Sequence, residues 1–102
     1  MDKEKVITAF KSAVLQVDNG AIIYLYGSRA RGDNKPDSDW DFLILTNLPK
    51  NKKTKDKFRN KIFDFELEYE QPISTIIHNK NEWNDYEITP LYQTISREGV
   101  RI

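Results

Sequence analysis

The spacing of apolar residues near the N-terminus predicts an amphipathic helix over residues 3 to 17. Apolar side chains recur there at steps of three and four residues, which is the spacing of one helix face: Val6, Ile7, Phe10, Val14 and Val17. Asp2 can cap the start of this helix, and the pair Asn19-Gly20 ends it. A second helix is predicted near the C-terminus, where Pro90 begins the segment and Gly99 ends it.

Three short apolar runs predict β-strands at residues 21 to 26, 39 to 45 and 72 to 78. The first, "AIIYLY", is rich in β-branched and aromatic residues and lies between two glycines. In the second run the side chains alternate, so Asp39 and Asp41 share one face of the strand while Trp40 and its apolar neighbours occupy the other. The third run begins with a proline, which is tolerated at a strand start.

Two patterns overlap in residues 58 to 69. Phe58, Ile62, Phe65 and Tyr69 have helical spacing, whereas the alternation of apolar and acidic residues over 63 to 69 is typical of a half-buried strand. The preceding "NKKTKDKFRNK" lacks strand formers, and a helix between the second and third strands is a crossover of ordinary length. We therefore prefer the helix.

This order of elements predicts one α/β (α+β) domain over residues 1–102, with a small mixed sheet and helices packed mainly on one face. The chain has no cysteine, which excludes disulfides and thiolate metal sites. Its 16 Lys and Arg balance 16 Asp and Glu, which argues against a protein that holds nucleic acid mainly through its phosphates. A protein without net charge is less protected against self-association than a charged one, so a homo-oligomer is compatible with this sequence.

The sequence contains no apolar run of membrane-spanning length, and "MDKEKVITAFKSAV" lacks the uninterrupted apolar segment of a signal peptide. We therefore expect a cytoplasmic protein without a membrane partner.

Candidate chemistry is concentrated in "GSRARGDNKPDSDWD", where Gly27-Ser28 is followed after ten residues by Asp39-Trp40-Asp41. Either part alone is ordinarily a turn or a strand end. Together they offer a backbone that a ligand can approach closely at Gly27, the Ser28 hydroxyl, and a short helix start suited to phosphate. Arg29 is a further candidate for contact with phosphate, whereas Arg31 can equally pair with Asp33 or Asp37.

The two aspartates of this motif have the spacing of metal ligands. On one face of a strand their Cα atoms are about 6.5–7 Å apart, and their carboxylates can converge on Mg²⁺ that also binds substrate phosphates.

This motif resembles that of the minimal nucleotidyltransferases of the DNA polymerase β superfamily, which is Gly-Ser, ten residues, then Asp-x-Asp. The resemblance implies a polymerase β-like nucleotidyltransferase fold and Mg²⁺-dependent transfer of a nucleotide from ATP or another nucleoside triphosphate. It implies that Gly27 and Ser28 contact the phosphates, and that Asp39 and Asp41 bind the metal and are catalytic. Minimal members often pair with a small helical toxin of the HEPN type, which implies an antitoxin that adenylylates a toxin tyrosine.

The sequence departs from the family at the third carboxylate, which normally lies on a strand after Asp-x-Asp. The predicted strand at 72 to 78 has no acid, and Ser74 or Thr75 occupies the corresponding place. If residues 63 to 69 formed the strand, one of three acids could supply the carboxylate: Asp64, Glu66 and Glu68. The alternative function is therefore a catalytically weakened module that neutralises a partner protein by binding.

Overall fold

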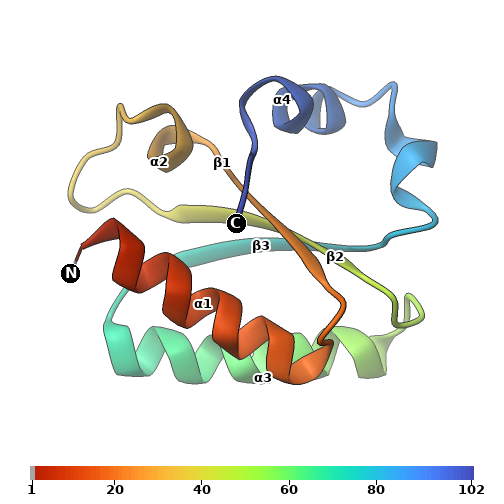
Figure 1. Ribbon diagram of the computed structural model, residues 1–102, viewed down its shortest axis with the longest axis horizontal. Helices are drawn as coiled ribbons and strands as arrows, with labels where there is room; N and C mark the ends of the chain where they lie inside the picture. Colours follow the sequence, from red (N-terminus) through yellow and green to blue (C-terminus); the bar gives the residue numbers. More distant parts are fainter. Residues whose placement is uncertain (1) are drawn as a thin grey trace.

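The N-terminal helix forms as the sequence predicts. A computed structural model describes residues 2–102, and in it α1 spans Lys3–Val17 (Figure 1). The Asp2 side chain caps the helix by accepting a hydrogen bond of 2.9 Å from the backbone N–H of Lys5. The apolar stripe of α1 is buried through Val6, Phe10 and Val14.

Four strands form one mixed sheet in the order β3-β2-β1-β4. β1 (Ile22–Tyr26) pairs antiparallel with β2 (Trp40–Thr46), and β2 pairs in parallel with β3 (Ile73–Asn79). The three predicted strands are confirmed to within one residue at each end. β4 (Val100–Arg101) pairs antiparallel with β1 and is not predicted by the sequence, because two residues carry no usable periodicity.

The segment with two competing patterns is helical. α3 (Lys52–Tyr69) is capped by Asn51 and makes the crossover that a parallel strand pair requires. Its residues with helical spacing are buried or packed against the core, whereas Phe63 and Leu67 are 60% and 66% exposed. A strand would have buried these two side chains, so the strand interpretation is wrong.

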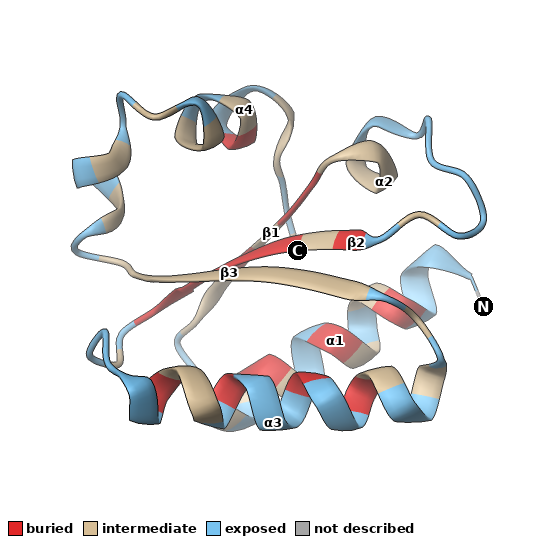
Figure 2. Cartoon of the chain, turned by 180° about the vertical axis from the view of Figure 1, so that it is seen from behind, coloured by how far each residue is buried: buried red, intermediate tan, exposed pale blue. Residues whose placement is uncertain are grey.

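The two long helices, α1 and α3, lie side by side on one face of the sheet (Figure 1). Every second residue of β2 enters this core, and the Phe42 ring stacks on that of Phe10 at 3.9 Å between centroids. In Figure 2 the buried positions of both helices face the strands. The core therefore confirms that Trp40, Phe42 and Ile44 point away from the face that carries Asp41.

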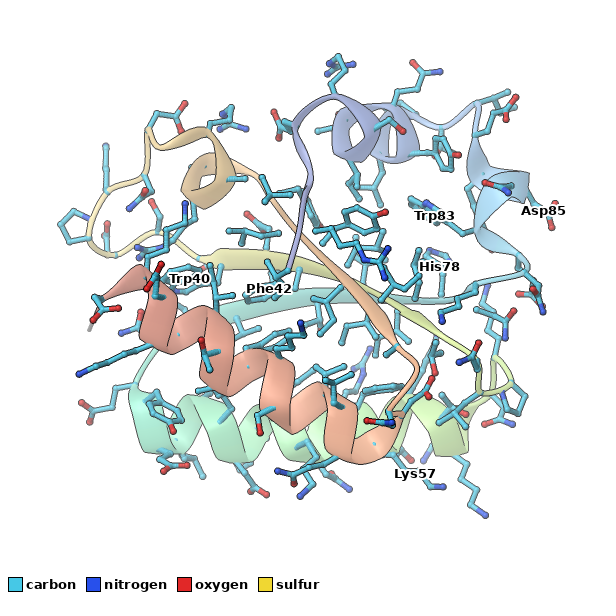
Figure 3. All side chains as sticks on the ribbon, in the orientation of Figure 1. Trp40, Phe42, Lys57, His78, Trp83 and Asp85 are labelled. Carbon is cyan, nitrogen blue, oxygen red and sulfur yellow. The ribbon has the colours of Figure 1, made fainter. Side chains whose placement is uncertain are left out.

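The opposite face is covered in part by the C-terminal region. The short 3-10 helix η1 (Trp83–Tyr86) precedes α4 (Pro90–Glu98), which starts and ends where the sequence predicts. Ile95 is buried there, and it packs in a small second cluster. Figure 3 shows His78 and Trp83 together at the η1 end of the molecule, well separated from Trp40 near α2. Within residues 2–102, none of the helices has both the length and the apolar character needed to cross a membrane.

Candidate functional site

The two halves of the motif meet because β1 and β2 are antiparallel neighbours. Tyr26, the last residue of β1, pairs with Asp41 near the start of β2. Gly27 and Ser28 follow directly after β1, and Asp39 directly precedes β2. Side chains that are ten or more residues apart in the sequence are therefore brought to one end of the sheet.

Gly27 is required by its contact with Asp41. Its φ of 75° is a conformation that residues with a side chain rarely adopt. A Cβ atom at this position would lie 2.4 Å from Asp41 Oδ2, so any substitution would displace the carboxylate. The structure thus gives a reason for the glycine that the sequence does not reveal, namely close packing against the aspartate.

Ser28 begins the one-turn helix α2 (Ser28–Arg31), and its carbonyl oxygen accepts a 2.9 Å bond from Gly32 N–H. Arg29 has a structural role in the next loop. Its guanidinium donates to the carbonyl oxygens of Ser38 and Pro36 at 2.9 and 3.1 Å and stacks over the Trp40 ring at 4.4 Å. Contact between Arg29 and phosphate stays a prediction, and it would have to coexist with these bonds or replace them.

Asp41 is half-buried in a negative environment. Burial raises the pKa of Asp41 above its ordinary value, and the charges of Asp39 and Glu98 raise this pKa further, against an opposing effect of Arg31. Burial and the Asp41 charge likewise raise the pKa of Tyr26, which keeps that phenol protonated. A bound divalent cation would relieve the repulsion between the aspartates, so Asp39 and Asp41 fit a metal by charge as well as by their oxygen ligands.

No acid of β3 joins the two aspartates. Ser74 pairs in register with Asp41 and lies beside it on the same face, whereas Thr75 belongs to the opposite face. Asp64, Glu66 and Glu68 belong to α3, on the far side of the sheet, as the helical interpretation predicts. Across the described residues 2–102, no three or more His, Cys, Asp or Glu side chains are grouped so that they could hold a metal ion.

One acidic residue of the site has no motif in the sequence. Glu98, at the end of α4, accepts hydrogen bonds through Oε1 from Gly27 N–H at 3.2 Å and from Arg31 Nη1 at 2.9 Å. Arg31 also pairs with Asp33 at 3.1 Å, as its sequence neighbourhood suggested. The sequence offers one signal for Glu98. An acid at a helix C-terminus is electrostatically unfavourable, which indicates that its charge needs a compensating partner.

The arrangement supplies oxygen ligands for a hard cation beside a loop with hydrogen-bond donors, which is what a nucleoside triphosphate and its metal require. A solved structure described as "putative minimal nucleotidyltransferase" is similar to this chain, with a TM-score of 0.67 and 19% sequence identity. The match covers 100% of this chain and 97% of that one, and it supports the predicted fold.

No curated protein matches the chain. The family model "Nucleotidyltransferase domain" matches residues 3–101, which is almost the whole sequence. Domains of this family generally use a divalent metal. The chain therefore belongs to the nucleotidyltransferase domain family.

Proposed function

We propose that this protein is a Mg²⁺-dependent nucleotidyltransferase that transfers AMP from ATP to a tyrosine hydroxyl of a partner protein. The observation that carries the proposal is the packing of Asp41 against Gly27, with the pKa of Asp41 raised by burial and by neighbouring carboxylates. A partly buried carboxylate whose pKa is shifted by burial and by a specific neighbouring charge is a candidate for a functional site. The partner proposed from family resemblance is a HEPN-type toxin in the same cytoplasm, which the transfer would neutralise.

In the proposed reaction, the tyrosine oxygen attacks the α-phosphorus of ATP. A new P–O bond forms, the bond to the β-phosphate oxygen breaks, pyrophosphate leaves, and the hydroxyl proton passes to solvent. Asp39 and Asp41 would hold the metal, and Mg²⁺ would offset negative charge on the triphosphate. The Gly27 N–H and the Ser28 hydroxyl would orient the phosphates, so the contribution of the chain is mainly positioning and electrostatic stabilisation.

A second candidate function is supported by the absence of an acid in β3. With Ser74 beside Asp41, the site lacks the third carboxylate that would activate the attacking hydroxyl. A weakened enzyme of this kind would neutralise its partner by binding alone. The partner could also supply or order the missing group, in which case transfer would be fast only in the complex.

The decisive experiment uses ATP labelled at the α-phosphate and, as the proposed acceptor, a HEPN-type protein. We expect label on a tyrosine of that protein when Mg²⁺ is present, and no label with Asp41→Asn. A complex that forms with no label transferred would favour the binding module. Failure of the purified chain to bind either ATP or the partner would contradict both functions.

A further inference from the structure

The carboxylate of Glu98 is hydrogen-bonded to Gly27 and to Arg31 of α2. Its Oε1 atom accepts from a backbone donor, Gly27 N–H at 3.2 Å, and from a charged donor, Arg31 Nη1 at 2.9 Å. The Glu98 side chain is 20% exposed and its bond with Gly27 N–H is partly buried, whereas the Arg31 side chain is 45% exposed and its bond with Glu98 is open to solvent. Hydrogen bonds to a charged acceptor are stronger than neutral ones, particularly where water is excluded.

Glu98 occupies this position against two unfavourable electrostatic effects. It is the last residue of α4, where the helix dipole presents its negative end. It also lies close enough to Asp41 to contribute to the raised pKa of that carboxyl, after burial and Asp39. The Gly27 N–H and the guanidinium of Arg31, which also pairs with Asp33, hold the Glu98 carboxylate in this position, so both are donors that an anion can use here.

The backbone that carries Glu98 is fixed beside the loop. After Gly99, Val100 and Arg101 pair with Leu25 and Tyr24 of β1, the strand that leads directly into Gly27. The backbone N–H of Ile102 also donates to the Ile23 carbonyl oxygen at 3.0 Å. The Glu98 carboxylate can therefore leave the loop by rotation of its side chain while α4 and β4 stay in place.

We propose that Glu98 occupies, in the free protein, the anion position that a phosphate of the bound triphosphate takes, so that the nucleotide must displace the Glu98 carboxylate. This inference rests on the proposed function, because that function puts the triphosphate on the same loop. A backbone N–H and a guanidinium are the donors that phosphates use in proteins. The apparent affinity for nucleotide is then reduced in proportion to the fraction of protein in which Glu98 leaves the donors free.

The test compares three proteins by isothermal titration with ATP and with inorganic tripolyphosphate, each with and without Mg²⁺. Glu98→Gln keeps an oxygen acceptor for Gly27 N–H but removes the charge that competes with phosphate. Glu68→Gln makes the same change of charge on exposed α3, across the sheet, and is the matched control. We expect Glu98→Gln to bind both ligands at least about fivefold more tightly than wild type, within the usual range of coupling between sites. Glu68→Gln should bind as wild type does.

Two results would overturn the inference, and they separate it from the proposed function. If wild type binds both ligands and Glu98→Gln binds them equally or more weakly, Glu98 supports the loop and is not displaced. If wild type and Glu98→Gln both fail to bind, the nucleotide site itself is wrong and the proposed function falls with it.

A second measurement needs no variant and covers the case in which Glu98→Gln does not fold. In an NMR titration of wild type with tripolyphosphate, the Gly27 amide and the Glu98 side-chain carboxyl resonances should shift together at the same ligand concentrations. A shift of the Gly27 amide without any change at the Glu98 carboxyl would contradict displacement.

Discussion

Two partly buried aspartates, Asp18 and Asp41, lie at opposite ends of β2, and their pKa values are shifted in opposite directions. Asp18 accepts hydrogen bonds from Thr46 Oγ1 at 2.6 Å, from Asn47 N–H at 2.8 Å and from Gly20 N–H. Burial alone would raise the pKa of Asp18, but these hydrogen bonds outweigh it and the pKa is lowered. The pKa of Asp41 is raised, by burial and then by the charge of Asp39.

The difference is the one expected between a structural carboxylate and the carboxylate of the proposed site. Asp18 joins the end of α1 to the end of β2, and its charge is satisfied within the protein. Asp41 faces other carboxylates, with Arg31 as the one opposing charge among the causes of its pKa shift. Burial and nearby like charges make the ionised form of a carboxylate less favourable than it is in water, and a bound cation would reverse this. Burial acts in the same direction on both carboxylates, so the opposite directions of their pKa shifts come from their partners.

The largest expected effect is on transfer activity. Asp41→Asn should lower nucleotide transfer by at least about 100-fold, because it removes a metal ligand and a charge that acts on the transition state. The fold should be intact or slightly more stable, since one member of a repelling pair is neutralised. Asp39→Asn should behave in the same way. Steady-state rates with labelled ATP, together with circular dichroism, check both parts, and full activity in either variant would refute the assignment.

Asp18→Asn should have the opposite consequence. It should destabilise the protein by about 1 kcal/mol, the scale of a hydrogen bond to a charged group at a partly exposed site. Its affinity for ATP and Mg²⁺ should stay at the wild-type value. Urea unfolding measures the first part and titration the second, and a stability equal to that of wild type would show that the Asp18 contacts are energetically neutral.

The effect of pH on the free energy of unfolding should also distinguish Asp18 from Asp41. The pKa of Asp18 lies below 3.8 in the folded state, so its stabilising effect is complete above that pH and is lost as pH falls through the folded pKa. The pKa of Asp41 lies above 3.8, so ionised Asp41 destabilises the fold at neutral pH. That destabilisation disappears as the pH falls through the raised pKa towards 3.8.

The measurement is the urea midpoint of each variant relative to wild type, from about pH 7 down to about pH 3. The deficit of Asp18→Asn should shrink at the acid end. The excess stability of Asp41→Asn should be present at neutral pH and should shrink as the pH falls through the window between the raised pKa and 3.8. Parallel curves for the two variants would contradict the contrast between the two aspartates.

The smallest expected effect concerns the acids of α3. Replacement of Asp64, Glu66 and Glu68 by the matching amides should leave metal and nucleotide binding unchanged, because α3 packs on the other face of the sheet. Transfer activity, if present, should also be unchanged. A loss of several orders of magnitude in rate would mean that one of these carboxylates reaches the site.

Local patterns allowed much of the fold to be predicted from the sequence. The alternation in 39 to 45 gives the faces of Asp41 and Phe42 correctly, because a strand determines the direction of each side chain. In residues 58 to 69 the helical spacing predicts the structure correctly and the alternation of apolar and acidic residues does not. Only a helix buries Phe58 and Ile62 while leaving Phe63 exposed.

The parts that were missed depend on contacts between distant residues. Glu98 reaches Gly27 from 71 residues away, and no spacing rule joins an isolated glutamate at a helix end to a glycine loop. β4 is too short for any periodicity and forms only because β1 presents a free edge. The bonds of Arg29 to Pro36 and Ser38 depend on the course of the loop, which the sequence does not reveal, and the contact of Arg29 with phosphate stays a prediction.

The central claim, that the Asp41 end of β2 is a site for nucleotide and metal, is tested most directly by titration of ATP with Mg²⁺ into three proteins. Wild type and Asp18→Asn should bind with the same affinity, and both should gain thermal stability from the ligand by mass action. Asp41→Asn should lose the part of the affinity that depends on Mg²⁺. Equal binding by Asp41→Asn and wild type, or no binding by wild type at millimolar nucleotide, would contradict the claim.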